Sequence, residues 1–517
     1  MATPSEKLAA SLEALRALQA RGIVAIRSAD LSRTHRERLL RSGFLHEVMK
    51  GWYIPAREDQ SAGESTAWYV SFWSFCAAYL RHRFGEAWCL SPEQSLSLHV
   101  GNHTVPPQLL VNAPRGSNKP TALPHGTSIF DARYPLPDAR AVTVLDELRL
   151  FSLPAALVRV GPGFFRHSPT DARAALAAIR DASDVLAELL HGGHSTVAGR
   201  LAGAFRNIGR TRIADEIVRT MRAAGYDVRE SDPFDDVPKI TLPTRERSPY
   251  VNRVKLMWQA MRGVAAAGFP APPYGPIDPD AYLARVDEVY VADAYHSLSI
   301  EGYRVSAELI ERVQAGEWDP DGDADDRERR DALAARGYYE AFQSVRGSVA
   351  KVLGGEDPGA VADEHHGDWY RELWAPSVTA GIVRPADLAG YRNGPVYIRR
   401  SMHVPPPHGA VRDLMPALFE CLRDEDDPAA RAVLGHFVFV YIHPYMDGNG
   451  RIGRFLMNLL LAAGGYPWTV VPVGRREEYM AALELASTGQ DISRFANFLG
   501  GLMQDNLDGR SPLGLDP

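Results

Sequence analysis

One polar stretch near the C-terminus constrains the fold more than any other part of the chain. It spans residues 443–454 and reads HPYMDGNGRIGR. Apolar residues recur at three- and four-residue steps on both sides of it: Val433, Leu434, Phe437, Val438 and Tyr441 before it, and Ile452, Phe455, Leu456, Leu459 and Leu460 after it. This period is typical of helices with a buried face. The sequence therefore predicts two buried helices joined by a polar loop whose side chains are held in place.

The glycine and arginine residues of this loop are of the types that bind phosphate. Gly448-Asn449-Gly450 is expected to open the second helix, and the first turn of a helix offers free backbone N–H groups and positive partial charge to an anion. Arg451 and Arg454 are three residues apart and therefore neighbours on one helix face. Their forked, always-charged guanidinium groups suit phosphate better than lysine does. The loop thus predicts a polyphosphate site.

Two further residues add chemistry to that site. Asp447 supplies a carboxylate oxygen, a ligand that Mg²⁺ accepts while it keeps phosphate oxygens and waters in its other positions. His443 precedes the anion-binding turn, where a neutral imidazole can take a proton from an attacking hydroxyl. The alternative is an ordinary polar loop between two helices.

The stretch resembles the signature of the Fic (filamentation induced by cAMP) family, H-x-F-x-D/E-G-N-G-R-x-x-R. It matches throughout except that Tyr445 replaces the usual Phe, at a position that packs inward. The resemblance implies an all-α Fic core and a protein adenylyltransferase, which uses ATP and Mg²⁺ to transfer AMP to a Ser, Thr or Tyr hydroxyl of a target protein. Relatives that phosphorylate have Lys where Gly450 stands, so the resemblance favours AMP transfer over phosphorylation.

The same resemblance assigns a role to each residue of the loop. His443 would deprotonate the incoming hydroxyl and Asp447 would hold Mg²⁺. The turn of Gly448, Asn449 and Gly450 would bind the oxygens of the α-phosphate. Arg451 would lie on the β-phosphate side and Arg454 toward the γ-phosphate.

An inhibitory helix is expected around residues 290–303. Ser297 and Glu301 lie four apart before Gly302, which matches the S/T-x-x-x-E-G/N pattern of inhibitory helices in Fic proteins. The resemblance implies that Glu301 pairs with Arg454 and keeps it from the terminal phosphate of ATP. Two alternatives remain: Glu301 positions water for removal of AMP from a modified protein, or it is a surface glutamate.

Two further segments of the C-terminal half resemble parts of Fic proteins. The run from Ile398 through Met402, His403 and Val404 reads as a small β-hairpin, which in the family is a flap that receives the target main chain as an added strand. Tyr479 resembles a residue beside the nucleotide, although an aromatic residue on an amphipathic helix is more often part of the core.

The first 60 residues read as a winged helix-turn-helix with two short helices, capped by Ser28 and by Ser32 or Thr34, and a hairpin tipped by Lys50-Gly51. They resemble the start of AbiEi-type antitoxin and regulator proteins. The basic residues Arg33, Arg36, Arg38 and Lys50 either contact DNA or form a solvated face. A DNA-binding regulator or antitoxin-like protein whose Fic site senses a nucleotide is therefore the alternative to an enzyme.

Length and composition predict a multidomain protein. A chain of 517 residues exceeds a single ordinary core, and its net charge of −7 gives no general nucleic-acid footprint. The expected regions are the winged helix (1–60), an AbiEi-like α+β region (61–170), a helical linker (171–248) with one alanine-rich helix over 172–190, and the Fic domain (249–505).

Cysteine usage and hydropathy give the expected environment of the chain. Three scattered cysteines fit a reducing cytoplasm, and no apolar run approaches the roughly 18 residues that span a bilayer. Family analogy alone suggests a homodimer.

Overall fold

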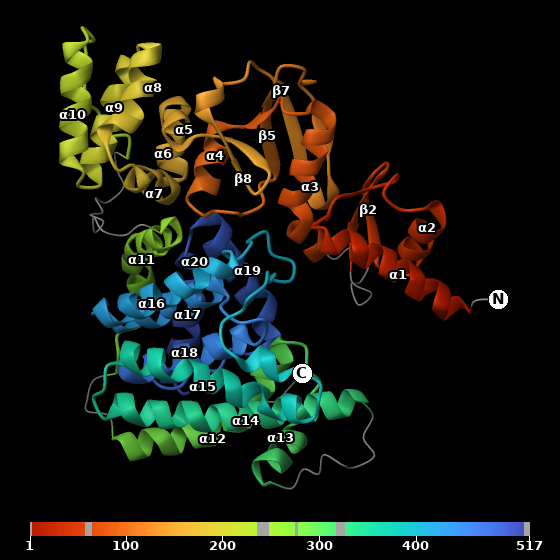
Figure 1. Ribbon diagram of the computed structural model, residues 1–517. Coiled ribbons are helices and arrows are strands. Elements are labelled where there is room, and N and C mark those ends of the chain that lie inside the picture. The colour runs from red at the N-terminus through yellow and green to blue at the C-terminus, as the bar shows by residue number, and fades with distance from the viewer. Residues whose placement is uncertain (1–2, 57–64, 235–247, 274–277, 317–325, 511–517) are drawn as a thin grey trace. The chain divides into compact units, whose positions relative to one another are not determined.

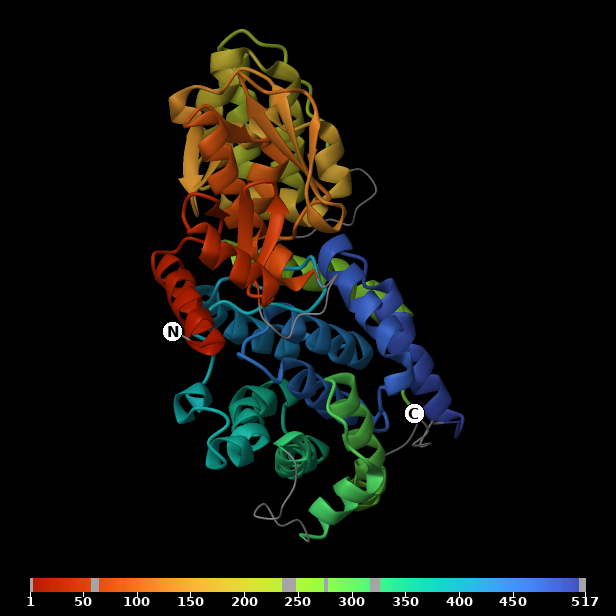
Figure 2. The same ribbon diagram turned by 90° about the vertical axis from the view of Figure 1, so that its right-hand side faces the viewer.

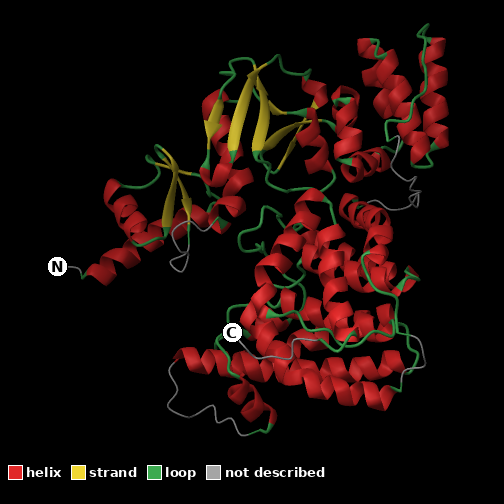
Figure 3. Ribbon diagram, turned by 180° about the vertical axis from the view of Figure 1, so that it is seen from behind, coloured by secondary structure: helices red, strands yellow, loops and turns green. Residues whose placement is uncertain are grey.

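The computed structural model describes residues 3–56, 65–234, 248–273, 278–316 and 326–510. The chain divides into two compact units. The N-terminal unit contains Met1–Arg253 and the short segment Tyr397–Val404, and the C-terminal unit contains Val254–Val396 and Pro405–Pro517. The strands of the described residues, yellow in Figure 3, all lie in the N-terminal unit, and the C-terminal unit is helical.

The N-terminal unit begins with α1 (Pro4–Ala20), β1 (Ile26–Arg27), α2 (Arg33–Arg41), β2 (Leu45–Met49) and β3 (Trp52–Pro55). The three strands form an antiparallel sheet in the order β1-β3-β2. The hairpin tip at Lys50-Gly51 is confirmed, as is Ser32 as an N-cap, because its hydroxyl accepts a hydrogen bond from the His35 N–H. The first of the two predicted short helices is wrong: residues 28–31 form a turn in which the Asp30 carboxylate accepts the Arg27 N–H.

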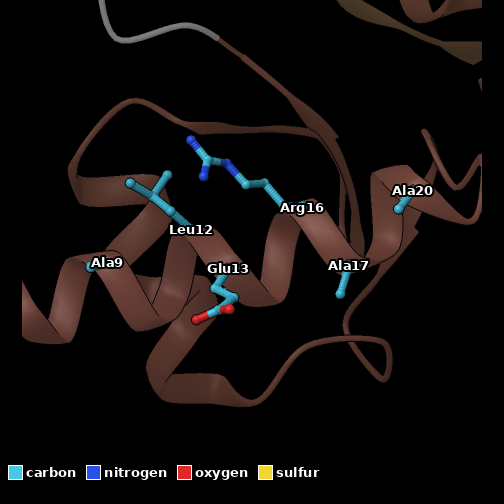
Figure 4. A pocket seen from close by; sticks show the side chains of 6 residues that line it. All are labelled: Ala9, Leu12, Glu13, Arg16, Ala17 and Ala20. Atoms are coloured by element: carbon cyan, nitrogen blue, oxygen red, sulfur yellow. The ribbon is translucent and has the colours of Figure 1, made fainter.

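One face of α1 carries a surface pocket, seen in Figure 4 and lined by Ala9, Leu12, Glu13, Arg16, Ala17 and Ala20. A helix face of small apolar residues with one charge of each sign is a solvated surface. It holds no cluster of the side chains that bind metals or carry out catalysis.

The middle of the unit contains both helices and strands. It consists of α3 (Thr66–Phe84), β4 (Cys89–Leu90), α4 (Pro92–His99), β5 (Gln108–Ala113), β6 (Pro120–Ala122), β7 (Ser128–Arg133), β8 (Val142–Leu145) and β9 (Leu148–Phe151). Four strands form a sheet in the order β4-β5-β7-β6, and β5 and β7 pair in parallel with Gln108 opposite Ser128. Trp52 and Ile54 of β3 share one core with the aromatic residues of α3, so the first hairpin and this region are packed together.

Six helices complete the unit: α5 (Leu153–Arg159), α6 (Pro162–His167), α7 (Pro169–Ala178), α8 (Ala182–Gly192), α9 (Ser195–Asn207) and α10 (Thr211–Ala223). The single helix predicted over 172–190 is wrong. Ile179 leaves the helical conformation, with φ −72° and ψ 122°, and the Asp181 carboxylate accepts the Ser183 N–H to start a new helix.

After α11 (Pro249–Ala267), which contains the boundary between the units, the C-terminal unit comprises α12 (Pro279–Ile300), α13 (Ala307–Gln314), α14 (Asp326–Leu353), α15 (Pro358–Thr379), α16 (His408–Asp424), α17 (Pro428–Ile442), α18 (Asn449–Ala463), α19 (Arg476–Gly489) and α20 (Ser493–Leu507). The helices α14 and α15 lie side by side (Figures 1 and 2), and α12 packs on α14. The pair α17 and α18 is buried almost throughout, as predicted, so the loop between them is fixed at both ends.

The predicted β-hairpin flap is not a strand pair. Residues 397–404 contain a turn in which the Ser401 N–H donates to the Ile398 carbonyl, with Arg400 at φ 61°. The backbone groups that a ladder would use have partners in the N-terminal unit: Met402 O accepts from Val105 N, and Arg400 N donates to Thr66 Oγ1. Pro405, Pro406 and Pro407 follow, and proline has no N–H to extend a ladder.

Two negative findings concern the environment of the chain. None of the helices in the described part of the chain combines the length and apolar character that crossing a bilayer requires. The three cysteines, Cys76, Cys89 and Cys421, are all free.

Candidate active site

The loop between α17 and α18 is held in one conformation by its own backbone and by Asn449. His443 ends α17 with φ 54°, and Gly448 opens α18 with φ 83°, a left-handed conformation that glycine adopts without strain. The Asn449 side chain accepts the Tyr445 N–H at 2.8 Å and donates to the Tyr445 carbonyl at 2.9 Å. The side chain of Asn449 therefore closes the loop, and the group it offers to a ligand is its backbone N–H.

Tyr445 packs inward, as predicted for the position where the family has Phe. It is 1% exposed, and its ring stacks on Tyr370 of α15 with centroids 3.9 Å apart. The hydroxyl finds an acceptor in the carbonyl of His366 at 3.4 Å. The exchange of Phe for Tyr is therefore accommodated without an unpaired buried polar atom.

A buried arginine that sequence reasoning did not single out supports the loop from outside. Arg392 is 2% exposed and donates through Nε to the His443 carbonyl at 2.7 Å. Its Nη2 donates to the carbonyls of Pro406 and Ile442, and its backbone N–H donates to the Pro444 carbonyl. Arg392 therefore links the backbone of His443 to Gly394, before residues 397–404, and to Pro406, after them.

His443 has the tautomer that a general base requires. Its Nδ1 lies 3.2 Å from the carbonyl of Val440, and a carbonyl can only accept, so Nδ1 carries the proton and Nε2 keeps a lone pair. Burial lowers the pKa of His443 to about 4, against a raising effect of the Val440 hydrogen bond. The imidazole is therefore neutral at physiological pH.

Asp447 is the predicted metal ligand. It is exposed, and one carboxylate oxygen, Oδ1, accepts the Gly448 N–H at 2.6 Å. The other oxygen remains available to a hard cation that arrives with a phosphate. Within the described residues no group of three or more His, Cys, Asp and Glu side chains is arranged to hold a metal ion, so a cation there would depend on the nucleotide for its remaining ligands.

The predicted pairing of Glu301 with Arg454 is present. Arg454 Nη2 donates to Glu301 Oε1 at 2.8 Å and to the Ser297 carbonyl at 3.0 Å, and Nε donates to Ser297 Oγ at 2.9 Å. Both Ser297 and Glu301 lie at the C-terminal end of α12, so one helix end holds the arginine.

Charge strengthens this pair on both sides. Burial opposes ionisation of Glu301, but attraction to Arg454 and Arg451 and the hydrogen bond from Arg454 outweigh it and lower the pKa of Glu301. Burial likewise opposes the charge on Arg454, and Glu301 more than offsets this and raises the pKa of Arg454. The carboxylate lies so close to Gly450 that a Cβ at that position would collide with it, which explains why glycine stands there.

Arg451 lies in a different environment from Arg454. It is 1% exposed, and its guanidinium carbon lies 5.2 Å from the ring centroid of Tyr303 and 4.9 Å from that of Trp374. Neither aromatic residue was singled out from the sequence. Their contribution depends on α15 and on the turn after α12 reaching α18, which spacing along the chain does not reveal.

The structure places Tyr479 in the core. It is 1% exposed, and its hydroxyl lies 2.6 Å from Nε2 of His436, with Phe495 and Phe498 around it. Burial raises the pKa of Tyr479 to about 12, and Arg454 lies near enough to oppose that rise. Tyr479 therefore packs in the core near Arg454, and its ring has no exposed face on which an adenine could stack.

The predicted DNA-contacting residues lie in the N-terminal unit, and two of the four are engaged within the protein. Arg36 donates to the Ser28 carbonyl, and Arg38 donates to the Lys7 carbonyl and to Ser11 Oγ. Arg33 is exposed and pairs with Glu37 one turn on, and Lys50 is exposed at the hairpin tip.

The residues predicted for target docking are Ile398, Met402, His403 and Val404. Met402 and Val404 pack against the aromatic core of the N-terminal unit, and His403 is 3% exposed. This segment belongs to the N-terminal unit, and the loop of residues 443–454 belongs to the C-terminal unit.

Part of the chain, including the loop of residues 443–454, is similar to known proteins. Residues 368–461 match the model of the Fic/DOC family. The chain is 31% identical over 225 residues to the protein adenylyltransferase Fic of Drosophila virilis, covering 43% of this chain and 42% of the relative, and 29% identical over 225 residues to that of Drosophila melanogaster. The chain spans less than half the length of these relatives.

Among solved structures, Fic-1 from C. elegans aligns with a TM-score of 0.38 and 18% identity, over 63% of this chain and 92% of that one. A Fic domain containing signaling protein from Bacteroides thetaiotaomicron aligns with a TM-score of 0.36 and 18% identity, over 52% of this chain and 98% of that one. On the family match and the loop geometry together, the chain contains a Fic domain.

Proposed function

We propose that the C-terminal unit transfers AMP from ATP to a Ser, Thr or Tyr hydroxyl of a target protein, and that Glu301 restrains this activity by occupying Arg454. One observation carries the proposal. A neutral base, His443, shares a rigid loop with the N-terminus of α18 and with two buried guanidinium groups. The names of the curated relatives, protein adenylyltransferase Fic, support the same reaction class.

The reaction follows from the groups in the loop. The target hydroxyl oxygen attacks the α-phosphorus, its proton passes to Nε2 of His443, and the bond from phosphorus to the bridging oxygen of pyrophosphate breaks. The N–H groups at the start of α18 face the charge that develops on the α-phosphate, and Arg451 and Arg454 bind the departing pyrophosphate. Asp447 would hold Mg²⁺, which adds positive charge beside the phosphates when the nucleotide is bound.

Glu301 opposes this reaction by charge and by position. Its carboxylate takes a donor of Arg454 and lies against Gly450, where the terminal phosphate would have to enter. The negative charge of Glu301 repels phosphate, and its hydrogen bond with Arg454 occupies a donor that would otherwise bind phosphate. The proposal therefore includes a site that is complete but restrained.

Position-specific labels of ATP test the transfer directly. Full-length protein is incubated with Mg²⁺ and ATP labelled at either the α- or the γ-phosphate, and covalent label on protein is measured. The proposal expects label from the α-position only, none with His443→Ala, and unchanged label with His408→Ala, an exposed histidine at the start of α16. Label from the γ-position would show phosphorylation and overturn the proposal.

The second candidate within the same site is removal of AMP. Its support is that the Glu301 carboxylate is only 27% exposed yet charged, close to the α18 N-terminus, where it can orient a water. Incubating an AMP-modified target with wild type and with Glu301→Gln distinguishes the two. Release of AMP by wild type alone assigns removal to the site.

DNA binding by the N-terminal unit is a separate proposal. Its support is that Arg33, at the start of α2, and Lys50, at the tip between β2 and β3, are both exposed. Arg33→Ala with Lys50→Ala is expected to weaken DNA retention and flatten its salt dependence, whereas Arg16→Ala with Arg21→Ala, matched in charge on α1, is not. The absence of DNA retention by wild type at low salt would rule it out.

The proposal also retains the assembly and the compartment expected from the sequence. It does not retain residues 398–404 as the target-docking segment, because the backbone groups of Arg400 and Met402 are already bonded and His403 is 3% exposed. A homodimer is tested by light scattering of the full chain. The three free cysteines are consistent with the reducing cytoplasm.

A further inference from the structure

Two buried hydrogen-bond donors at the start of α18 lack acceptors. Arg451 Nε and Trp374 Nε1 are both inaccessible to solvent, and neither has a hydrogen-bond partner in the described part of the chain. Buried donors in folded proteins are paired in the great majority of cases, because an unpaired one costs about 1–3 kcal/mol. Their presence here indicates that an acceptor from outside the protein belongs at this place.

The charge of Arg451 gives the same indication. Its guanidinium is 1% exposed and always ionised, yet it has no ion pair among the described residues, since the carboxylate of Glu301 is bonded to Arg454. Aromatic faces on both sides, from Tyr303 and Trp374, attract the cation but do not neutralise it. Glu301 attracts Arg451 from a distance, but a buried cation with no carboxylate bonded to it favours an anion as the missing partner.

The indole donor of Trp374 and the guanidinium of Arg451 both lie beside Gly448. A Cβ built at Gly448 would lie 3.0 Å from Trp374 Nε1 and 3.6 Å from an Nη2 atom of Arg451. The indole N–H therefore stands beside the turn whose backbone N–H groups open α18. Helix dipole, guanidinium and indole donor all lie at one end of the loop.

The glutamate lies at the other end. A Cβ built at Gly450 would meet Glu301 and would lie 3.3 Å from Arg454 Nη1, whereas Gly448 has Trp374 and Arg451 as its neighbours. Glu301 therefore occupies the Gly450 end of the loop and leaves the Gly448 end to a ligand. The two arginines of the motif therefore lie at different ends of the loop.

We propose that Trp374 is a phosphate-binding residue of the nucleotide site. Its indole N–H donates to an oxygen of the phosphate that Arg451 also binds, and its ring holds the guanidinium of Arg451 in place. The inference rests on the proposed nucleotide chemistry of the Fic domain. Its ligand is the diphosphate part of a nucleoside diphosphate or triphosphate. AMP lacks the phosphate that Arg451 binds, so it does not accept a hydrogen bond from Trp374.

The test measures affinities of ADP and AMP for full-length protein by calorimetry, in the presence of Mg²⁺. Trp374→Phe keeps an aromatic face for Arg451 but removes the donor. The expected result is a loss of ADP affinity of roughly ten-fold, the effect of one hydrogen bond to a charged group, with AMP affinity unchanged. The same loss is expected in the Glu301→Gln background, because Glu301 lies at the other end of the loop.

Trp369→Phe is the matched control. Trp369 lies on the same helix, is fully buried, and donates its indole N–H to Ser348 Oγ at 3.2 Å, so its replacement tests general damage to α15. It should leave the ratio of ADP to AMP affinity unchanged. If Trp374→Phe also leaves that ratio unchanged while wild type binds ADP, the role of Trp374 is overturned and the Fic chemistry stands. If wild type binds neither ADP nor ATP, both fall.

Discussion

The guanidinium of Arg454 and the carboxylate of Glu301 lie 2.8 Å apart although 153 residues separate them in the chain. Arg454 is 4% exposed, and the end of α12 gives it three acceptors: Glu301 Oε1, Ser297 Oγ and the Ser297 carbonyl. Its Nη1 has no hydrogen-bond partner in the described part of the chain, so Nε and Nη2 carry all the contacts to α12. The end of α12 therefore fixes the guanidinium of Arg454 as much as the loop does.

Ser297→Ala is expected to weaken this hold. It removes the acceptor of Arg454 Nε and leaves a buried charged donor unpaired, which costs about 1.5–3 kcal/mol. Chemical denaturation of the full chain measures the loss. Ser299→Ala, on the same helix and without a side-chain hydrogen bond in the structure, is the control and should fall within about 0.5 kcal/mol of wild type. Equal losses in the two variants would contradict the role of Ser297.

Arg392→Lys is expected to slow the chemistry without weakening nucleotide binding. The guanidinium fixes the backbone of His443 and Ile442, and a lysine cannot reach all four carbonyls that Arg392 contacts. Misplacement of the base by about 1 Å costs up to about a hundred-fold in rate. Transfer rates and ADP affinities measured on the same preparation separate the two effects. Loss of ADP affinity in proportion to rate would show that the variant has damaged the whole site.

The pH dependence of transfer should lack the inflection of an ordinary histidine. Burial lowers the pKa of His443 to about 4, so the base is already neutral at pH 6 and gains nothing as the pH rises to 8. The turnover rate of Glu301→Gln at saturating ATP and Mg²⁺ measures this. A rate that doubles as the pH passes through about 6.5 would mean that the imidazole titrates at its unperturbed value.

The raised pKa of Asp293 predicts that the protein loses stability as the pH rises. Burial raises the pKa of Asp293 to about 6, although Tyr338 donates a hydrogen bond to it at 2.7 Å. Because the pKa of the folded state exceeds that of the unfolded state, the contribution is present in full below about pH 4 and is lost as the pH rises through 6.

Asp293→Asn should abolish this loss. A pKa shift of about two units corresponds to roughly 3 kcal/mol, so the variant should gain thermal stability over wild type at pH 8 and keep only about half of that gain at pH 5. Thermal unfolding at the two pH values measures the difference. A constant difference between variant and wild type would show that Asp293 keeps its charge at both.

The sequence predicted the parts of the site that are local or that follow a fixed pattern. The loop from His443 to Arg454 lies within a dozen residues, and its glycines and the apolar periods on both sides of it predict a fixed loop between two buried helices. Glu301 could be paired with Arg454 because both lie in recognisable patterns. Ser297 followed from helical spacing on the same segment.

Other residues depend on contacts that spacing does not reveal. Arg392, Trp374 and Tyr303 reach the loop from three separate segments, and an arginine or aromatic residue alone carries no signal of that. The flap was predicted as a hairpin because extended runs flank a turn. In the structure its backbone groups form hydrogen bonds with Val105 and Thr66, hundreds of residues away in the chain. The break at Ile179 was missed because alanine-rich residues on both sides favour helix equally.

The most direct test of the restrained transferase compares four forms of the full chain in α-labelled ATP and Mg²⁺: wild type, Glu301→Gly, His443→Ala and the double variant. The account predicts weak label on wild type, stronger label on Glu301→Gly, and none on either form that lacks His443. Label on Glu301→Gly no stronger than on the double variant would contradict it.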